Sequence, residues 1–270
     1  MINEELARRS TAVREYVVKM LAAAGAGHPG GSLSIVEILQ VLYGEFMHVR
    51  PQEPHWPGRD RLILSKGHAA PALYATLMMH GFFPEEELWN LRKCGAMLQG
   101  VPDMNRTPGI DMSTGSLGQG LSAGNGMALG ARLDHAGWRT YVICGDGEIE
   151  EGIIWEAAMT SAHFKLDNLT LIIDHNKLQL SGASEEVMNI IADKFRDFHW
   201  HTITIKGHDF DEIRAALKEA GETKGMPTAI IAETIKGKGV DFMENKAAWH
   251  NKTLDAAETK KALEELEGES

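Results

Sequence analysis

Two short polar stretches each follow an apolar run, and each offers oxygen atoms that could hold a charged ligand. "CGDGEIEEG" occupies residues 144–152, and "IIDHN" occupies residues 172–176. Asp146 supplies a carboxylate and Asn176 an amide oxygen. Hard cations such as Mg²⁺ and Ca²⁺ prefer such ligands, and Mg²⁺ often adds phosphate oxygens. Two hypotheses follow: a metal–diphosphate site, or a turn aspartate and a capping asparagine without a ligand.

The backbone beside Asp146 also suits an anion. Gly145 and Gly147 have no side chain, so a ligand can approach the backbone closely. The next helix is expected to begin near Glu150, and the N-terminus of a helix attracts negative charge. A metal–diphosphate unit would use all of these features, although their spacing alone leaves both hypotheses open.

Glycine-rich turns elsewhere carry histidines. "GHPGGSLS" (27–34) and "SKGHAAPALYA" (65–75) each place a histidine beside glycine at the start of a helical segment. "STGSLGQGLSAGNGMAL" (113–129) is a glycine-rich entry into a helix, and His250 lies in the late stretch "WHNK". A single histidine in a loop is usually an ordinary surface residue. Three of them, each in such a turn, are less easily dismissed as surface residues.

The elements that must position these residues alternate along the chain. Strands are expected at 61–65, 139–144, 169–174, 201–205 and 227–233. Helices are expected at 4–26, 34–48, 70–80, 85–93, 118–135, 150–163, 188–197, 209–220 and 254–267. This alternation is typical of βαβ units and a parallel sheet, whose ligands lie beyond the carboxyl ends of the strands. Asp146 and Asn176 should therefore meet at that edge.

Size and composition favour one large α/β domain spanning residues 1–270, with helices on both faces of the sheet. The formal net charge of −11 argues against a nucleic-acid partner. The start "MINEELARRS" lacks a signal-peptide core, and no apolar run approaches the roughly 18 residues of a membrane helix. With two cysteines and no metal-binding cysteine spacing, the sequence predicts a cytoplasmic protein without a membrane partner.

Taken in order, these patches resemble the transketolase family. "GDGEIEEG" followed by "DHN" resembles the thiamine-diphosphate motif, and "GHPGGSLS", "DRLILSKGHA", "TPGIDMSTGSLGQGLSAGNGMALG" and "WHNK" resemble transketolase. The resemblance covers about residues 10 to 252. It implies the thiamine-diphosphate-binding fold and a transferase that moves a two-carbon ketol unit from a ketose phosphate, or a related sugar, to an aldose.

The resemblance also implies a role for each matching residue. Asp146, Asn176 and the backbone carbonyl of Leu178 would bind the metal, which would be Mg²⁺ or else Ca²⁺ or Mn²⁺. The residues expected to contact the cofactor are His68, Gly115, Ser116, Leu117, Gly145, Asp146, Gly147, Glu151, Asn176 and His250. The expected catalytic residues are His28, His68, His250 and Glu151. The histidines would move protons and stabilise developing alkoxides.

Only the first of the three transketolase domains is matched, which implies a partner. The domain that binds the cofactor's pyrimidine ring, with its activating glutamate, would belong to a C-terminal transketolase subunit. We expect an α2β2 heterotetramer that is active only when both subunits are present. Glu151 would meet the partner's glutamate, and Glu156 would join the same buried acidic network, whose pKa values would be displaced and coupled. The expected contact is the glycine-rich helix, through Gly124, Gly126 and Gly130.

One position departs from the family. "LQGVPDMN" places Val101 where transketolases carry a histidine that hydrogen-bonds the ketol end of the substrate. Valine cannot make that bond. Either another group supplies it, such as Gln99 or a partner side chain, or the donor is a branched or modified sugar.

Other functions remain open at this stage. A deoxyxylulose-phosphate synthase or a dihydroxyacetone-forming transketolase shares part of the pattern, although "STGSLGQG" favours transketolase. "GQGLSAG" (118–124) can be read as a nicotinamide-binding turn, but that motif needs a buried strand directly before it. A non-catalytic subunit that keeps the cofactor site is a further alternative, against which the Asp146–Asn176 pair argues.

Overall fold

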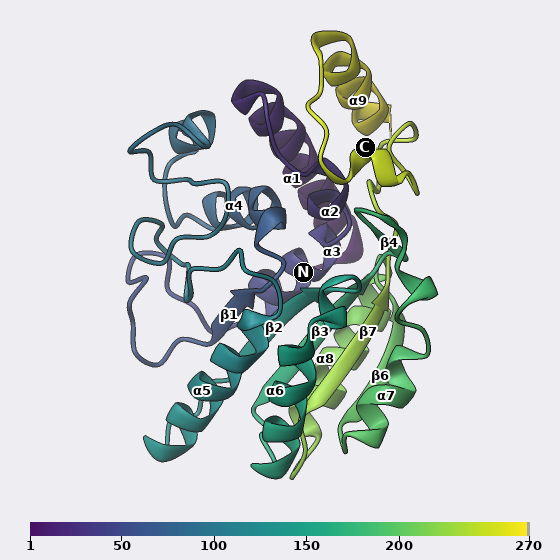
Figure 1. Ribbon diagram of the computed structural model, residues 1–270. Coiled ribbons are helices and arrows are strands. Elements are labelled where there is room, and N and C mark those ends of the chain that lie inside the picture. Colours follow the sequence, from purple (N-terminus) through teal and green to yellow (C-terminus); the bar gives the residue numbers. More distant parts are fainter. Residues whose placement is uncertain (269–270) are drawn as a thin grey trace.

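Five parallel strands form the centre of the molecule (Figure 1). The computed structural model describes residues 1–268, and the last two residues of the expected domain lie outside this part. The strands are β1 (Arg61–Leu64), β2 (Thr140–Gly145), β3 (Leu169–His175), β6 (His201–Lys206) and β7 (Thr228–Glu233). Their order across the sheet is β1-β2-β3-β7-β6, and all neighbours run parallel. Each lies where the sequence predicts a strand.

Helices cover both faces of this sheet, as predicted. On one face lie α5 (Gln119–Leu133), α6 (Gly152–His163) and α7 (Ile191–Asp197), packed on strand residues that include Val142, Leu171 and Ile231. On the other lie α1 (Asn3–Ala24), α3 (Val36–Val41), α4 (Ala70–Met79) and α8 (Phe210–Glu222), packed on alternate residues such as Tyr141, Ile143 and Ile172. In Figure 1, α5 and α6 pass in front of the sheet and α8 lies behind it. Burial on both sides explains why β2 and β3 are almost continuously apolar.

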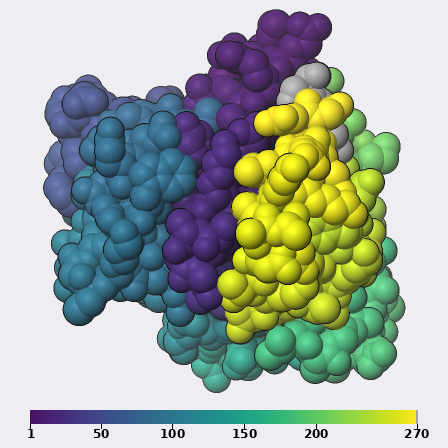
Figure 2. All heavy atoms as spheres, turned by 90° about the horizontal axis from the view of Figure 1, so that it is seen from above, coloured from purple at the N-terminus to yellow at the C-terminus, as the bar shows by residue number. Residues whose placement is uncertain are grey.

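The C-terminal helix α9 (Ala256–Gly268) packs beside α1. Figure 2 shows it from above, in yellow against the purple N-terminal helix. Ala262 and Leu266 are buried in the same apolar cluster as Val13 and Val17 of α1. Within residues 1–268, none of the helices has both the length and the apolar character that crossing a membrane requires.

Several expected elements differ in their limits. The predicted helix 34–48 is shorter, because α3 passes into a π-helical turn at Leu42–Phe46, and the predicted helix 85–93 is a 3₁₀ helix at Glu85–Asn90. The helices expected from 150 and 188 begin at Gly152 and Ile191. A charged 3₁₀ turn, Glu148–Glu150, precedes α6, and its residue types resemble those of a first helical turn.

Two short elements were not predicted, and both lie at the edge where β2 and β3 end. One is α2 (Pro29–Leu33), which begins directly after His28 and has proline in its first turn, where a missing N–H costs nothing. The other is a hairpin of β4 (Leu178–Gln179) and β5 (Gly182–Ala183). Strands of two residues carry too little periodicity to be recognised from sequence.

Candidate active site

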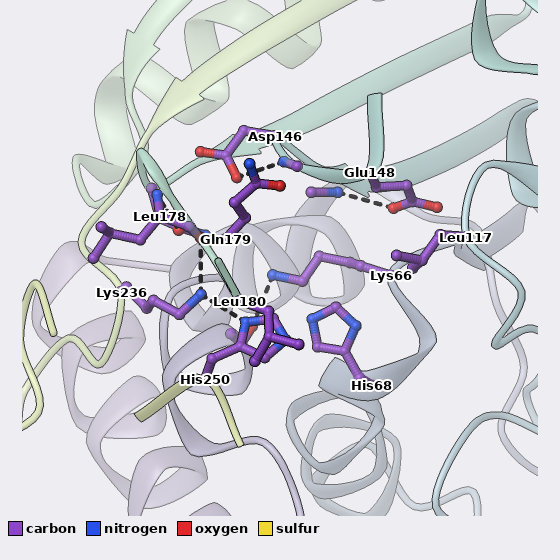
Figure 3. A pocket seen from close by; sticks show the side chains of 14 residues that line it. Lys66, His68, Leu117, Asp146, Glu148, Leu178, Gln179, Leu180, Lys236 and His250 are labelled. Carbon is purple, nitrogen blue, oxygen red and sulfur yellow. Dashed lines mark hydrogen bonds between the residues drawn. The ribbon is translucent and has the colours of Figure 1, made fainter. Parts of the chain in front are cut away.

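The strand-end residues meet as the sequence predicts. Asp146 follows β2 and Asn176 follows β3, and the register pairs Gly145 with Asp174, so both side chains leave the sheet at one edge. A cavity of about 200 Å³ lies there. Figure 3 shows side chains from several segments converging on it. Eight of the residues expected to bind cofactor or metal line this cavity: His68, Leu117, Gly145, Asp146, Gly147, Asn176, Leu178 and His250.

Asp146 is held in place by three donors. Its carboxylate accepts hydrogen bonds from the N–H groups of Gly147 and Lys177 and from the Ser184 hydroxyl. The side chain is buried, and burial together with the nearby Asp174 carboxylate raises its pKa. A like charge nearby disfavours the ionised form of Asp146, and a bound cation would relieve this effect. Asp146 therefore has the charge and the fixed orientation of a metal ligand.

The other two expected metal ligands lie on the short loop after β3. The Asn176 amide nitrogen donates to Asp174 Oδ2 at 2.8 Å, which directs its oxygen away from that carboxylate, and that oxygen accepts the Leu178 N–H at 3.2 Å. The Leu178 carbonyl accepts a hydrogen bond from Lys236 Nζ at 2.9 Å. Within residues 1–268, no three His, Cys, Asp or Glu side chains are grouped so that they could hold a metal ion. Amide, carbonyl and ligand oxygens would have to complete any coordination shell here.

Asp174 has a structural role behind the cavity. It is fully buried and forms an ion pair with Lys66, and it also accepts hydrogen bonds from the hydroxyls of Ser34 and Thr234. Burial opposes its ionisation, but Lys66 and these hydroxyls outweigh that effect and lower the pKa of Asp174. The same Lys66 ammonium donates to the carbonyl of Gly31 at 2.9 Å. This pair therefore fastens β3 to the α2 segment.

Glu148 ties three segments together at the wall of the cavity. Its carboxylate accepts from the Ser65 hydroxyl, from the Gly118 N–H at 2.9 Å and from the Gly145 N–H at 3.0 Å. Burial raises its pKa despite these bonds. The strand end, the loop after β1 and the start of α5 are thus held by one carboxylate, which the sequence prediction did not include.

His28, His68 and His250 form a triangle at the cavity. Their ring centroids lie 5.1 Å apart for His28 and His68, 5.5 Å for His28 and His250, and 5.2 Å for His68 and His250. These rings come from positions as distant as 28 and 250, and the fold brings them together. His68 and His250 line the cavity, and His28 lies beside both.

The three rings are uncharged near neutral pH. Burial, followed by the charge of Lys66, lowers the pKa of His68 well below its usual value. Burial and Lys236 lower the pKa of His250 to about 4, and burial and the Arg92 guanidinium lower that of His28. A neutral imidazole can both accept and donate a hydrogen bond. The triangle can therefore exchange protons with the oxygen atoms of a ligand.

Lys236, like Lys66 and Glu148, is a residue that the sequence prediction did not include. Its ammonium contacts His250 Nδ1 at 3.0 Å in addition to the Leu178 carbonyl, and Figure 3 shows it directed into the cavity. Burial and the positive charge of Lys66 lower its pKa to about 8. Two lysines, two histidines of the triangle and three glycines thus line one small space. This donor set fits an anion with several oxygens.

Close packing of glycines shapes the walls of the cavity. A Cβ on Gly147 would lie 2.8 Å from Gln179 Cβ, and one on Gly31 would lie 3.3 Å from His68 Nε2. Gly118 has φ +83°, and a Cβ on it would lie 2.7 Å from Ile153 Cγ2. A side chain at any of these positions would clash with its neighbours. At Gly147 the neighbour is Gln179 of the β4–β5 hairpin, so this glycine lets the hairpin pack against the end of β2, and the approach of a ligand to its backbone stays a prediction.

The glycine-rich entry to α5 lies at the mouth of the cavity. Leu117 lines it, whereas Gly115 and Ser116 are exposed just outside. Val101 packs on this segment, since a Cβ on Gly115 would lie 3.3 Å from Val101 Cγ2. The Tyr74 hydroxyl holds the backbone around Val101 by donating to the carbonyls of Gln99 and Val101, each at 3.0 Å. The segment before α5 is irregular, so "GQGLSAG" lacks the preceding strand that a nicotinamide turn needs.

The residues expected at a contact with a partner divide into two groups. Glu151 and Glu156 are exposed, and neither lines the cavity. Gly126 and Gly130 also face open space. The prediction for Gly124 is wrong: a Cβ there would lie 2.7 Å from Val142 Cγ2, so this glycine lets α5 pack closely on the sheet. A glycine in a helix can allow close packing either on the sheet or on a partner chain. The sequence alone does not show which of these two faces of the helix it lies on.

Comparison with known families finds one match across nearly the whole chain. The family described as "Transketolase, thiamine diphosphate binding domain" matches residues 6–269. The match includes all the residues that form the cavity. It bears out the predicted resemblance, the α/β fold class and the thiamine diphosphate cofactor.

Two curated relatives match almost from end to end. The 6-deoxy-6-sulfo-D-fructose transketolase subunit of Clostridium sp. (strain MSTE9) is 47% identical over 267 residues, which cover 98% of this chain and 97% of the relative. One of the subunits of the apulose-4-phosphate transketolase of Phocaeicola vulgatus is 42% identical over 265 residues, which cover 97% of this chain and 94% of the relative. Both relatives are named as subunits of transketolases.

Among solved structures, the transketolase of Campylobacter jejuni superimposes with a TM-score of 0.94 and 33% sequence identity. The superposition covers 99% of this chain and 43% of the other. This chain therefore spans about two fifths of the length of that transketolase. The parallel sheet and its flanking helices are common to both.

Proposed function

This chain belongs to the transketolase family, and from that premise we propose that it is the diphosphate-binding subunit of a two-subunit transketolase. The cavity beyond β2 and β3 carries this proposal, because it joins Asp146, Asn176 and Leu178 with two lysines and with His68 and His250, beside which His28 lies. The enzyme would transfer a two-carbon ketol unit from a ketose phosphate, or a related sugar, to an aldose.

The donor set suits a divalent metal with a diphosphate. Asp146, Asn176 and the Leu178 carbonyl would bind the metal, with Mg²⁺ as the first expectation and Ca²⁺ or Mn²⁺ as alternatives. Lys236 and His68 would face the diphosphate oxygens, and the backbone at Gly147 would approach them. Thiamine diphosphate, when bound, supplies a ring that accepts electrons while a bond between two sugar carbons breaks.

The histidines would act on the sugar. Burial and neighbouring cations keep His28, His68 and His250 neutral near pH 7 by lowering the pKa of each ring. Each can therefore take a proton from a hydroxyl or donate one hydrogen bond to a developing alkoxide. His28, which lies beside the two histidines that line the cavity, would face the substrate. Leu117 and Gly115 would lie along the cofactor.

A second chain would complete the site. Relatives that match this chain end to end are named as subunits, whereas a solved transketolase extends well beyond it. Glu151 and Glu156 would meet the partner's acidic network, and Gly126 and Gly130 would admit a partner helix closely. We infer an α2β2 heterotetramer from the paired active sites of the family.

Calorimetric titration tests the proposal directly. The assembled enzyme, stripped of metal by a chelator, is titrated with thiamine diphosphate in the presence and absence of Mg²⁺. Binding should require the metal, because the diphosphate and the Asp146 carboxylate are both anionic and need a cation between them. Tight binding that is indifferent to the metal, or no binding in either case, would contradict the proposal.

Val101 favours a second candidate, in which the sugar donor is branched or otherwise modified. Valine cannot replace the hydrogen bond of the family's histidine, and a polar site that loses one partner is weakened by about 1–3 kcal/mol. The names of the two relatives refer to 6-deoxy-6-sulfo-D-fructose, which is a modified sugar, and to apulose 4-phosphate. Neither is one of the usual pentose or hexose phosphates. A comparable donor would explain an apolar side chain beside Gly115.

The variant Val101→His distinguishes the two candidates. If the site is an ordinary ketol site that valine weakens, histidine should raise kcat/KM for xylulose 5-phosphate by about tenfold, the equivalent of one regained hydrogen bond. If the pocket is shaped for a modified sugar, histidine should crowd it and lower the rate on that donor. Val101→Ile serves as an apolar control. Equal rates for all three proteins on every donor would show that position 101 does not touch the substrate.

A further inference from the structure

A buried chain of three charged or polar side chains lies behind the active site, outside the cavity. Arg14 comes from α1, Glu37 from α3, and His208 from the turn between β6 and α8. Arg14 Nη2 donates to both Glu37 oxygens, at 2.6 and 2.8 Å, and His208 Nδ1 lies 2.9 Å from Glu37 Oε2. Arg14 and Glu37 are almost fully buried.

The contacts of His208 define its protonation. The Ile235 N–H donates to His208 Nε2 at 2.8 Å, so this nitrogen must carry a lone pair. The ring proton of a neutral imidazole then lies on Nδ1, where it is donated to Glu37. Burial opposes the ionisation of Glu37, but Arg14 and His208 outweigh it and lower the pKa of Glu37 to about 2. An ionised Glu37 therefore selects the tautomer of His208 that can hold Ile235.

The same chain reaches both sides of the active site. Arg14 Nε donates to the Lys238 carbonyl at 2.9 Å, and Nη2 lies 3.4 Å from the Leu33 carbonyl at the end of α2. α2 begins directly after His28. One buried guanidinium therefore contacts both the segment that follows His28 and the segment that carries Lys236.

The backbone of Lys236 is fixed on both sides as a result. His208 holds Ile235 before it, and Arg14 holds Lys238 after it. Between them, the Gly237 N–H donates to the Gly30 carbonyl at 3.0 Å, which joins this loop to α2 directly. A Cβ on Gly30 would lie 2.9 Å from Lys236 Cγ, so the lysine stem packs tightly on α2.

We propose that Arg14, Glu37 and His208 form a positioning network that fixes the Lys236 ammonium relative to His28 and thereby sets the affinity of the site for a diphosphate. This role rests on the proposed function, because it assumes that Lys236 meets the cofactor. A buried ion pair by itself is weak evidence for stability, since apolar residues can often replace it without loss. Here Arg14 and His208 also hold backbone that leads to the active site, and Glu37 joins the two side chains.

Variants of His208 test the network with matched chemistry. His208→Phe removes the donor to Glu37 and the acceptor for Ile235, whereas His208→Gln carries an amide that can supply both. His208→Asn keeps a donor near Glu37 but is too short to reach Ile235. It replaces the phenylalanine variant in the test if that variant does not fold. His201→Gln is the control, because His201 pairs with Glu219 at the surface, away from the cavity.

Two readouts on the assembled enzyme separate positioning from general stability. Hydrogen–deuterium exchange of residues 234–246 reports whether the loop is held, and calorimetry with thiamine diphosphate and Mg²⁺ reports affinity. Loss of groups that orient a binding residue typically weakens metal binding about 10- to 100-fold, and we expect at least about tenfold here for the phenylalanine and asparagine variants. Exchange of the Ile235 amide should quicken in both. Glutamine should restore both readouts toward wild type, and the control should change neither.

The outcomes are distinguishable. If wild-type enzyme does not bind thiamine diphosphate, the proposed function fails, whatever the exchange data show. If wild type binds and the loop of the phenylalanine or asparagine variant exchanges faster while cofactor affinity is unchanged, the proposed function stands and the positioning role is overturned. Unchanged exchange in both variants would also overturn it, because the loop would then be held by other contacts.

Discussion

Replacing Asp146 with alanine is expected to weaken the binding of thiamine diphosphate with Mg²⁺ at least about 100-fold, or about 2.7 kcal/mol. Asp146 is the one carboxylate among the three expected metal ligands, and Asn176 and the Leu178 carbonyl are neutral. Without its charge, the metal would be held by two dipoles and the diphosphate alone. Since the cofactor binds through the metal, its affinity should fall with that of the metal.

The alanine variant also leaves three donors without their acceptor. Gly147, Lys177 and Ser184 all donate to this carboxylate, and unsatisfied buried donors cost about 1–3 kcal/mol each. Two further variants separate this loss from the loss of charge. Asp146→Asn keeps the shape and one oxygen, and Ser184→Ala removes one donor without touching the proposed ligand.

Calorimetry of the assembled enzyme measures the affinity for the cofactor, and thermal unfolding measures the loss of stability. Asp146→Asn should lose less stability than the alanine variant, because its amide oxygen still accepts from part of these donors, and it should still bind the cofactor poorly, whereas Ser184→Ala should bind nearly as wild type does. If the alanine and asparagine variants both fold and retain wild-type affinity, Asp146 is not a metal ligand.

The sequence supports the positions of the strand ends well, for a physical reason. β2 and β3 are buried on both faces, so they appear as continuous apolar runs that end where the polar residues begin. Asp146 and Asn176 sit at those endings. Because parallel strands end at one edge of a sheet, their meeting could be predicted without coordinates. The three histidines were singled out by their glycine-rich turns, whereas their arrangement as a triangle appears only in the fold.

Lys66, Lys236 and Glu148 were not predicted, because their partners are distant in sequence. Lys66 pairs with Asp174, and Lys236 contacts Leu178 and His250. A lysine or glutamate in a polar loop is usually exposed, and only the fold shows that these are buried. Their neighbours offered one signal, since Lys66 lies in "SKGH" beside His68 and Glu148 lies in "GDGE" beside Asp146.

The hairpin after β3 shows a further limit. β4 and β5 are two residues each, and their pairing depends on Gly182 at φ +143° and on the Ser184 N–H, which donates to the Lys177 carbonyl. No periodic pattern marks so short an element. Yet this hairpin presents the Leu178 carbonyl to the cavity, so a site can depend on a contact that the sequence does not signal.

Without its partner, the isolated chain is expected to show no two-carbon transfer. Its cavity holds the expected diphosphate half of the site, and the expected metal ligands are already in place. Leu117 and Leu180, which line the cavity, are exposed by 37% and 71%, and Glu151 is exposed as well. Apolar side chains at the mouth of a polar site are typical of a surface that another chain covers.

Covering that surface would do two things for catalysis. It would exclude water, which strengthens the interaction of the histidine triangle and the lysines with charged oxygens. It would also bring the partner's carboxylate to Glu151 and so complete the acid network that the family uses. This chain alone would have neither effect. We therefore expect the rate of two-carbon transfer to rise from background to full turnover when the partner is added.

Reconstitution tests this account most directly. The two proteins are purified separately, and two-carbon transfer is measured from a panel of ketose donors, including modified and branched sugars, with thiamine diphosphate and Mg²⁺ present. We predict background rates for either protein by itself and rapid transfer when both are mixed at equal concentration, lost again when Asp146→Ala replaces the wild-type chain. Transfer by the isolated chain at the rate of the mixture, or none from any donor by a stable complex that binds the cofactor, would contradict the account.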